Sequence, residues 1–152
     1  MGGIIKKGLI APEEIIGADI MPQSRERVKE TYGIAVTADN KEAAEKSEVL
    51  ILSVKPQFYA QTIAEIRDCI REEQLIITIA PGKTLAWLEE QFRKPVKIIR
   101  TMPNTPALAG EGMTAVCPNA CVTEEEKAYA LEILGSFGKV EVVPEHLIDA
   151  GV

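Results

Sequence analysis

The sequence has few of the side chains that carry acid–base, metal or thiol chemistry. Of its 152 residues one is a histidine, His146, and three are cysteines, Cys69, Cys117 and Cys121. A single histidine argues against a histidine-based catalytic triad and against a histidine-rich metal site. The cysteines are odd in number and form no C-x-x-C pair, which argues against a disulfide framework or a zinc site. We therefore expect no bound metal and no catalytic residue of these types.

The sequence also lacks long apolar runs and an excess of basic residues. The net charge is -6, with 46% hydrophobic and 26% charged residues, the composition of an ordinary globular protein. An acidic chain is a poor partner for nucleic acid or an anionic membrane. No run approaches the roughly 20 apolar residues that span a bilayer, and residues 1–10 lack the apolar core of a signal peptide. We expect a cytoplasmic protein that acts on a small molecule.

Strand-like and helix-like segments alternate along the whole chain. This alternation predicts an α/β fold, a Rossmann-like doubly wound parallel sheet with right-handed crossovers and no internal domain boundary. Strands are expected over residues 13–19, 34–37, 48–54, 75–80, 96–99, 113–117 and 139–143. Helices are expected over residues 1–10, 22–32, 41–46, 57–73, 85–92, from 123 to about 134, and from 145.

The stretch Arg100–Pro106 is the centre of this pattern. It follows the apolar run Val96–Ile99 and holds two prolines, two threonines and Asn104. Proline fixes its own φ and pushes the preceding residue out of helical space, so a stiff, extended loop is expected. Ligands of open α/β sheets bind at the carboxyl ends of the strands, and this loop lies at such an end.

Two other predicted strands end in the same way, with Ser53-Val54-Lys55-Pro56 and Ile79-Ala80-Pro81-Gly82. Small residues let the backbone approach a flat ligand, and proline makes each turn rigid. Together the three strand ends predict a ledge for a nucleotide or a nicotinamide ring. Asp19 ends another predicted strand, where a ribose-binding acid belongs, although an exposed strand-end carboxylate is the simpler interpretation.

A glycine-rich phosphate turn would complete a dinucleotide site, and it is incomplete here. G-x-G-x-x-G needs a strand before it and a helix after it. The sequence shows Met1-Gly2-Gly3 and a helical stripe that Pro12 stops. We therefore expect the sheet to lack its first strand.

These motifs, in this order and spacing, resemble the N-terminal domain of pyrroline-5-carboxylate reductase, truncated at both ends. The resemblance covers essentially the whole chain. It rests on Met1-Gly2-Gly3 with Lys7-Gly8-Leu9-Ile10, Asn40-Lys41-Glu42, Ser53–Gln57, Ile79–Gly82, Arg100–Pro106, Glu111-Gly112-Met113-Thr114 and Leu147-Ile148-Asp149-Ala150.

The resemblance implies an oxidoreductase of proline biosynthesis, which reduces 1-pyrroline-5-carboxylate to L-proline with hydride from NADPH or NADH. A protonated cyclic imine is already electrophilic, so the protein mainly aligns two rings and excludes water. No catalytic side chain is then needed. By position, the resemblance assigns cofactor contacts to Met1, Gly2, Asp19, Ile20, Asn40, Ser53, Val54, Lys55, Pro56, Ile79, Ala80, Gly82, Met102 and Asn104.

The resemblance also divides the chain. Residues 1–144 correspond to the NAD(P)-binding domain, and residues 145–152 to the start of a helical domain for dimerisation and substrate binding. We expect the full-length form to be a homo-oligomer and this chain alone to be inactive. Cofactor preference stays open, because Asp19 disfavours a 2′-phosphate, whereas Arg25 and Arg27 favour one.

Three alternatives remain at this point. The chain is a non-catalytic nucleotide-binding or sensing module, another reductase on the same scaffold such as a β-hydroxyacid dehydrogenase, or a structural partner domain. The second ranks low, because such enzymes carry a glycine-rich substrate loop where this chain has Met102–Pro106.

Overall fold

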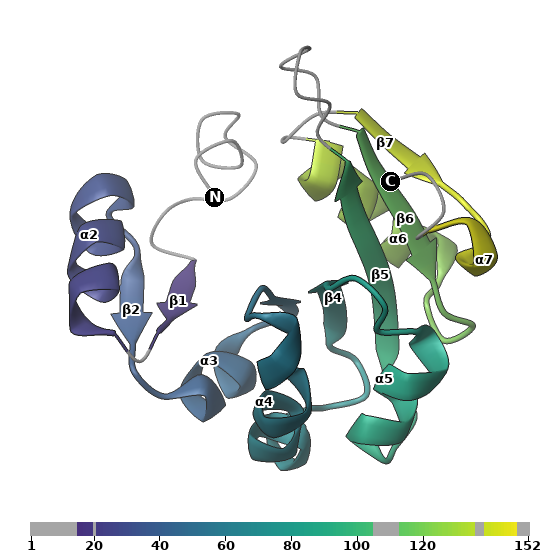
Figure 1. The fold of residues 1–152 in the computed structure, drawn as a ribbon. Coiled ribbons are helices and arrows are strands. Elements are labelled where there is room, and N and C mark those ends of the chain that lie inside the picture. Colours follow the sequence, from purple (N-terminus) through teal and green to yellow (C-terminus); the bar gives the residue numbers. More distant parts are fainter. Residues whose placement is uncertain (1–14, 20, 105–112, 136–138, 149–152) are drawn as a thin grey trace.

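The structure is a computed structural model that describes residues 15–19, 21–104, 113–135 and 139–148, and it confirms the predicted α/β fold (Figure 1). The strands are β1 Ile16–Ala18, β2 Ala35–Thr37, β3 Val49–Leu52, β4 Leu75–Ile79, β5 Lys97–Asn104, β6 Met113–Pro118 and β7 Lys139–Val142. The α-helices are α2 Pro22–Tyr32, α3 Asn40–Lys46, α4 Tyr59–Ile66, α5 Leu85–Phe92, α6 Glu124–Gly135 and α7 Glu145–Ile148, and the 3₁₀ turns are η2 Pro56–Phe58 and η3 Arg67–Cys69. The helix expected over residues 1–10 lies outside the described residues.

The described strands form two sheets, a parallel pair β1-β2 and a five-stranded sheet in the order β3-β4-β5-β6-β7. Figure 1 shows β1, β2 and α2 on one side of the molecule, with α3 between them and the larger sheet. Strands β3, β4 and β5 are parallel, as expected, whereas β6 runs antiparallel to β5. Only residues 105–112 connect β5 to β6, and a parallel crossover needs a dozen or more residues. The sheet is therefore mixed, with β6 and β7 reversed.

Both faces of the larger sheet are covered, as a doubly wound fold requires. One core cluster joins α3, α4, α5 and α7 to the face that carries Leu50, Ile76 and Ile98. The second joins α6 to the opposite face, which carries Ile77 and Ile99. Adjacent residues of one strand thus enter different clusters, which explains why the strands are apolar without alternation. Among the described helices, none has the length and apolarity to cross a membrane.

Several predicted helix boundaries are confirmed by hydrogen bonds or backbone angles. Gly33 ends α2 with φ +69°, a left-handed conformation that favours glycine. Asp39 caps α3 and Thr84 caps α5 through their side chains. A capping box begins α6, because the Thr123 amide donates to Glu126 Oε1 (2.9 Å) and the Glu126 amide donates to Thr123 Oγ1 (3.1 Å).

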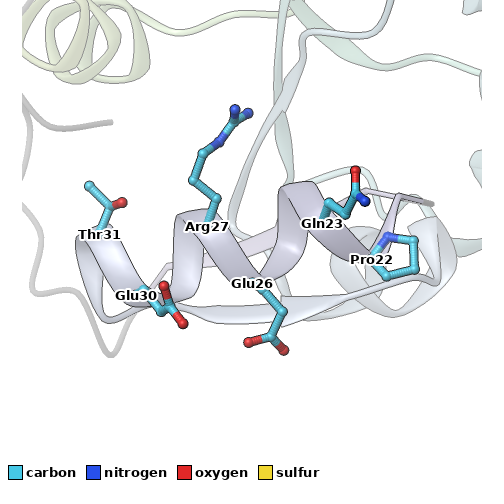
Figure 2. A pocket seen from close by; sticks show the side chains of 6 residues that line it. All are labelled: Pro22, Gln23, Glu26, Arg27, Glu30 and Thr31. Atoms are coloured by element: carbon cyan, nitrogen blue, oxygen red, sulfur yellow. The ribbon is translucent and has the colours of Figure 1, made fainter.

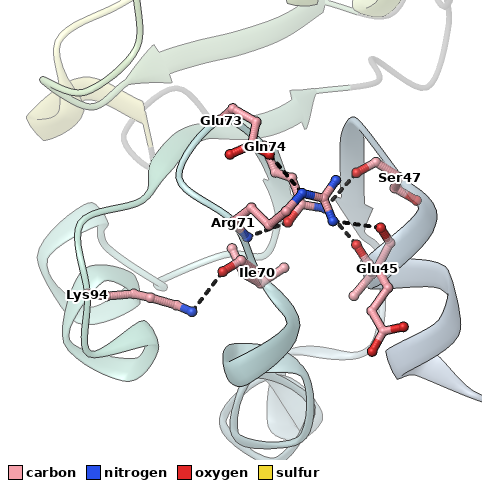
Figure 3. A network of polar contacts seen from close by, with 8 residues as sticks. Glu45, Ser47, Ile70, Arg71, Glu73, Gln74 and Lys94 are labelled. Atoms are coloured by element: carbon pink, nitrogen blue, oxygen red, sulfur yellow. Dashed lines mark hydrogen bonds and ion pairs between the residues drawn. The ribbon is translucent and has the colours of Figure 1, made fainter.

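The prediction of one long helix over residues 57–73 is wrong at its C-terminal end. Helix α4 stops at Ile66, η3 adds one turn, and Ile70 is extended. The buried side chain of Gln74 donates to the carbonyls of Ala44 and Ser47, both at 2.6 Å, and accepts from the Arg71 amide at 2.5 Å (Figure 3). The Gln74 side chain thus accepts the Arg71 amide, which a continued helix would bond to a backbone carbonyl, and the helix ends early.

Strand β5 is longer than predicted. The sequence suggested a strand to Ile99 followed by a loop, but β5 continues to Asn104 and pairs with β6 from Ile99 to Asn104. Strand β4 ends opposite Thr101, so the following residues have a described strand neighbour only on the β6 side. An edge of this kind is where a strand tolerates Pro103, which has no amide hydrogen to donate.

Candidate functional site

Two of the three predicted strand ends lie next to each other, and the third segment continues a neighbouring strand. In the parallel sheet Leu52 pairs with Thr78, and Ile79 pairs with Thr101. The turns that begin at Ser53 and Ala80 therefore leave the sheet at one edge. Residues 102–104 of β5 extend beyond that edge. We call Ser53–Pro56 and Ile79–Gly82 with Met102–Asn104 the ledge.

The ledge combines exposed polar groups with small or half-buried residues. Ser53 and Lys55 are exposed, whereas Val54 is half-buried and packs against the first core cluster. Ala80 is 1% exposed. Gly82 is exposed and has φ +73°, which a side chain would strain, so the turn after β4 needs glycine at this position. This mix suits a flat ring that contacts backbone and apolar side chains.

Tyr59 links the ends of β3 and β4 through two hydrogen bonds of its hydroxyl. The sequence alone did not indicate a role for it. Its side chain is fully buried at the start of α4. The hydroxyl donates to the carbonyl of Leu52 and accepts from the amide of Ile79 at 3.1 Å. Burial raises the pKa of Tyr59 to about 12, with a smaller opposing effect from the Ile79 amide, so the hydroxyl keeps its proton at neutral pH.

Two of the assigned residues belong to β5. Met102 is half-buried and packs against the first core cluster, so only part of it is available to a ligand. The backbone of Asn104 pairs with Met113 of β6. The side chain of Asn104 lies outside what the structure describes, and its role stays a prediction.

Asp19 and Asn40 follow the two strands of the smaller sheet, Asp19 after β1 and Asn40 after β2. Asp19 follows β1, is exposed, and accepts the Met21 amide on Oδ1 at 2.8 Å. Its carbonyl accepts a hydrogen bond from Arg25 Nη1 at 2.8 Å. Asn40 is the first residue of α3 and is half-buried. The Arg25 guanidinium thus contacts the backbone of Asp19 at the carboxyl end of β1, and the ribose role of Asp19 stays a prediction. Met1, Gly2 and Ile20 lie outside the described residues.

The residues that define the ledge include no histidine, cysteine or carboxylate. His146 is exposed, Cys121 is exposed, and Cys117 is buried in the core. Burial, with Glu145 nearby, raises the pKa of the Cys117 thiol, which disfavours a reactive thiolate. In the described part of the chain no three metal-ligating side chains come together.

A hollow runs along one side of α2, away from the ledge. Figure 2 shows its lining, in which Glu26 and Arg27 point in different directions from the helix. None of the assigned cofactor residues lines it. The lining residues are Pro22, Gln23, Glu26, Arg27, Glu30 and Thr31.

Known proteins resemble this chain in sequence and in structure. A sequence model of the family described as "NADP oxidoreductase coenzyme F420-dependent" matches residues 1–82. A pyrroline-5-carboxylate reductase from Synechocystis is 40% identical over 147 residues, which are 97% of this chain and 54% of that protein.

Two solved structures extend the comparison. A pyrroline-5-carboxylate reductase from Coxiella burnetii superposes with a TM-score of 0.90 at 31% identity, covering 97% of this chain and 55% of that one. The Plasmodium falciparum enzyme, solved with NADP bound, has a TM-score of 0.82 at 27% identity, covering 97% and 53%. The chain spans about half the length of the curated relatives it matches.

Proposed function

Because the chain belongs to the family described as coenzyme F420-dependent NADP oxidoreductases, we propose that it is the cofactor-binding part of a pyrroline-5-carboxylate reductase. The reaction is the reduction of 1-pyrroline-5-carboxylate to L-proline, the last step of proline biosynthesis. The observation that carries the proposal is the ledge, in which two turns assigned to the nicotinamide leave adjacent parallel strands and are joined by one buried hydroxyl.

The residues present fit a dinucleotide. The ledge receives the nicotinamide ring, and Asp19 with Asn40 receives the adenosine part. NADP is the favoured cofactor, since the P. falciparum relative was solved with NADP bound and Arg25 lies beside Asp19 to meet a 2′-phosphate. NADH remains a possible second donor. The assigned contacts, from Met1 and Gly2 to Asn104, stand as part of this proposal.

The chemistry that the cofactor supplies when bound is a hydride. The chain's own residues hold the ring and exclude water from one side of it, by means of half-buried Val54 and Met102 and buried Ala80. A protonated imine accepts hydride without a protein acid, which suits a ledge without titrating pairs. The substrate carboxylate and the homo-oligomer interface belong to the rest of the enzyme, for which residues 145–152 are the proposed start, and the enzyme acts in the cytoplasm.

A thermal melt of the 152-residue chain tests the proposal, alone and with a large excess of NADPH or NADH. At about 100 times the dissociation constant a ligand adds roughly 2.7 kcal/mol, a shift of several degrees in a domain of this size. S53Y places a ring on the ledge at an exposed position and is expected to abolish the shift. Q61Y, at an exposed position on α4, is the matched control.

The outcomes separate the candidate functions. A shift with NADPH that S53Y removes and Q61Y keeps supports the proposal. No shift with either cofactor contradicts it. A shift combined with steady turnover of 1-pyrroline-5-carboxylate by this chain alone would contradict the assignment of substrate binding to the rest of the enzyme. A shift in the chain, with no reductase activity in the full-length enzyme, would favour a nucleotide-sensing module.

A further inference from the structure

The loop between β3 and α4 begins and ends at the same hydrogen bond. Residues 53–58 separate Leu52, the last residue of β3, from Tyr59, the first residue of α4. The Tyr59 hydroxyl reaches back and donates to the Leu52 carbonyl. Inside the loop the Phe58 amide donates to the Lys55 carbonyl at 2.9 Å, which closes η2. The loop is thus held at both ends and turned once in the middle.

The same hydroxyl contacts the last rung of the β3–β4 ladder. The Leu75 amide donates to the Glu48 carbonyl at 3.0 Å, and parallel rungs repeat every two residues. Carried along the register to the final pair, Leu52 with Thr78, this spacing makes the Leu52 carbonyl and the Ile79 amide the two groups that face each other at the last rung. Tyr59 bonds to both of these atoms. Beyond them each chain leaves the sheet and enters the ledge.

We propose that Tyr59 is a positioning residue for the cofactor, whose hydroxyl fixes the spacing of the turns at Ser53 and Ala80. This inference rests on the proposed function. Among the described strands, the pairing of β3 with β4 ends at Leu52 and Thr78, so the relative position of the two turns depends on what braces them. A buried tyrosine is a stiff brace, because its ring is fully enclosed by the core and only the hydroxyl orientation remains free.

Y59F tests the proposal, because it keeps the buried ring and removes only the brace. The dissociation constant of NADPH for the 152-residue chain is expected to rise about tenfold, the factor that corresponds to one hydrogen bond. The matched control is I63V, because Ile63 lies on the same helix, is also fully buried, and has no side-chain atom that could form a hydrogen bond to either turn. I63V lowers the melting temperature and is expected to leave the dissociation constant within twofold.

Two further measurements keep the test decisive. Amide hydrogen exchange at Ile79 and Ala80 is expected to accelerate in Y59F and not in I63V. If Y59F shows no cooperative melt, 4-aminophenylalanine at position 59 replaces it. Its amine donates to the Leu52 carbonyl but accepts poorly from the Ile79 amide. The dissociation constant of NADPH is therefore expected to rise above that of the wild type, by less than tenfold.

The failures of the two proposals can be told apart. A wild-type chain that binds neither NADPH nor NADH removes the proposed function, and the positioning role with it. A wild-type chain that binds, with Y59F within twofold of it, overturns the positioning role alone. Equal weakening by Y59F and I63V also overturns it, because the effect would then follow from lost stability.

Discussion

Glu145 and Arg100, 45 residues apart in the chain, form an ion pair with 3.4 Å between Oε2 and Nη1. The guanidinium is buried in β5, and the carboxylate is about one-third exposed on α7. The same Glu145 oxygen accepts the amide of Leu85, the first residue of α5, at 2.6 Å. One carboxylate thus attaches α7 to both the central sheet and the start of α5.

Removal of this carboxylate is expected to destabilise the chain. E145A removes both contacts and should lower the free energy of unfolding by about 2 kcal/mol, less than for a fully buried pair because Glu145 is partly exposed. E145Q keeps an acceptor for Leu85 and should cost roughly half as much. Urea unfolding measures both, with E89Q at an exposed position of α5 as control. A loss below about 0.5 kcal/mol in E145A would contradict the interpretation.

Asn119 anchors the turn after β6. Its Oδ1 accepts the amides of Ile98 and Cys121, both at 3.2 Å, and its Nδ2 donates to the Val96 carbonyl at 2.8 Å. The residue is 8% exposed, so N119A leaves buried backbone groups without partners and should cost about 3 kcal/mol. N119D keeps an oxygen that can accept both amides, but it replaces the Nδ2 donor with a carboxylate oxygen that repels the Val96 carbonyl, so it should also destabilise the chain. Chemical denaturation measures the free energy of unfolding of both variants. If N119A lowers it no more than Q61A, at an exposed position of α4, Asn119 does not anchor the turn.

We expect Tyr59 to make the folded chain less stable at alkaline pH. Burial raises its pKa to about 12 in the folded chain, above the usual value near 10, so folding favours the protonated form. The resulting stabilisation is fully present below pH 10 and is lost as the pH rises through about 12. It amounts to about 2 to 3 kcal/mol. Unfolding of wild type and Y59F at pH 8 and pH 11 detects about half of this loss, because pH 11 lies between the two pKa values. The lysines and the other tyrosines titrate equally in both chains. A stability difference that does not change with pH would exclude this cause.

Arg25 is expected to set the cofactor preference. Its guanidinium lies at the carboxyl end of β1, where Nη1 donates to the Asp19 carbonyl. R25A should raise the dissociation constant of NADPH about fivefold, the effect of an exposed charge pair of roughly 1 kcal/mol, and should leave NADH within twofold. Titration followed by cofactor fluorescence measures both, and K29A, in the last turn of the same helix, is the control. Equal changes for the two cofactors would show that Arg25 does not contact a 2′-phosphate.

Local features of the fold were predictable from the sequence. Asp39, Thr84 and the Thr123–Glu126 pair mark helix starts because a cap binds amides two or three residues away. Gly33 ends α2 for a similarly local reason. The strands β3 and β4 were predictable because burial on both faces leaves an apolar run.

Features that depend on distant partners were not predictable in the same way. Gln74 donates to carbonyls 27 and 30 residues earlier, and nothing in its own neighbourhood indicates these partners. The extension of β5 through Pro103 depends on where β4 ends. Tyr59 looked like one more core residue at helical spacing, because its hydroxyl partners lie 7 and 20 residues away. The ledge residues were identified by pattern, and their cofactor contacts remain predictions.

The two sheets differ in how they are buried, and this has a consequence for their dynamics. No residue of β1, α2 or β2 belongs to either core cluster, and α2 has no buried residue. Amide protection follows local burial, so the unit from Ile16 to Thr37 should open and close many times while the larger sheet stays folded. An adenosine group bound beside Asp19 would then slow the exchange of this unit far more than that of β3–β5. The larger sheet would thus stay folded throughout binding, whereas the smaller β1–α2–β2 unit would be stabilised when the ligand binds.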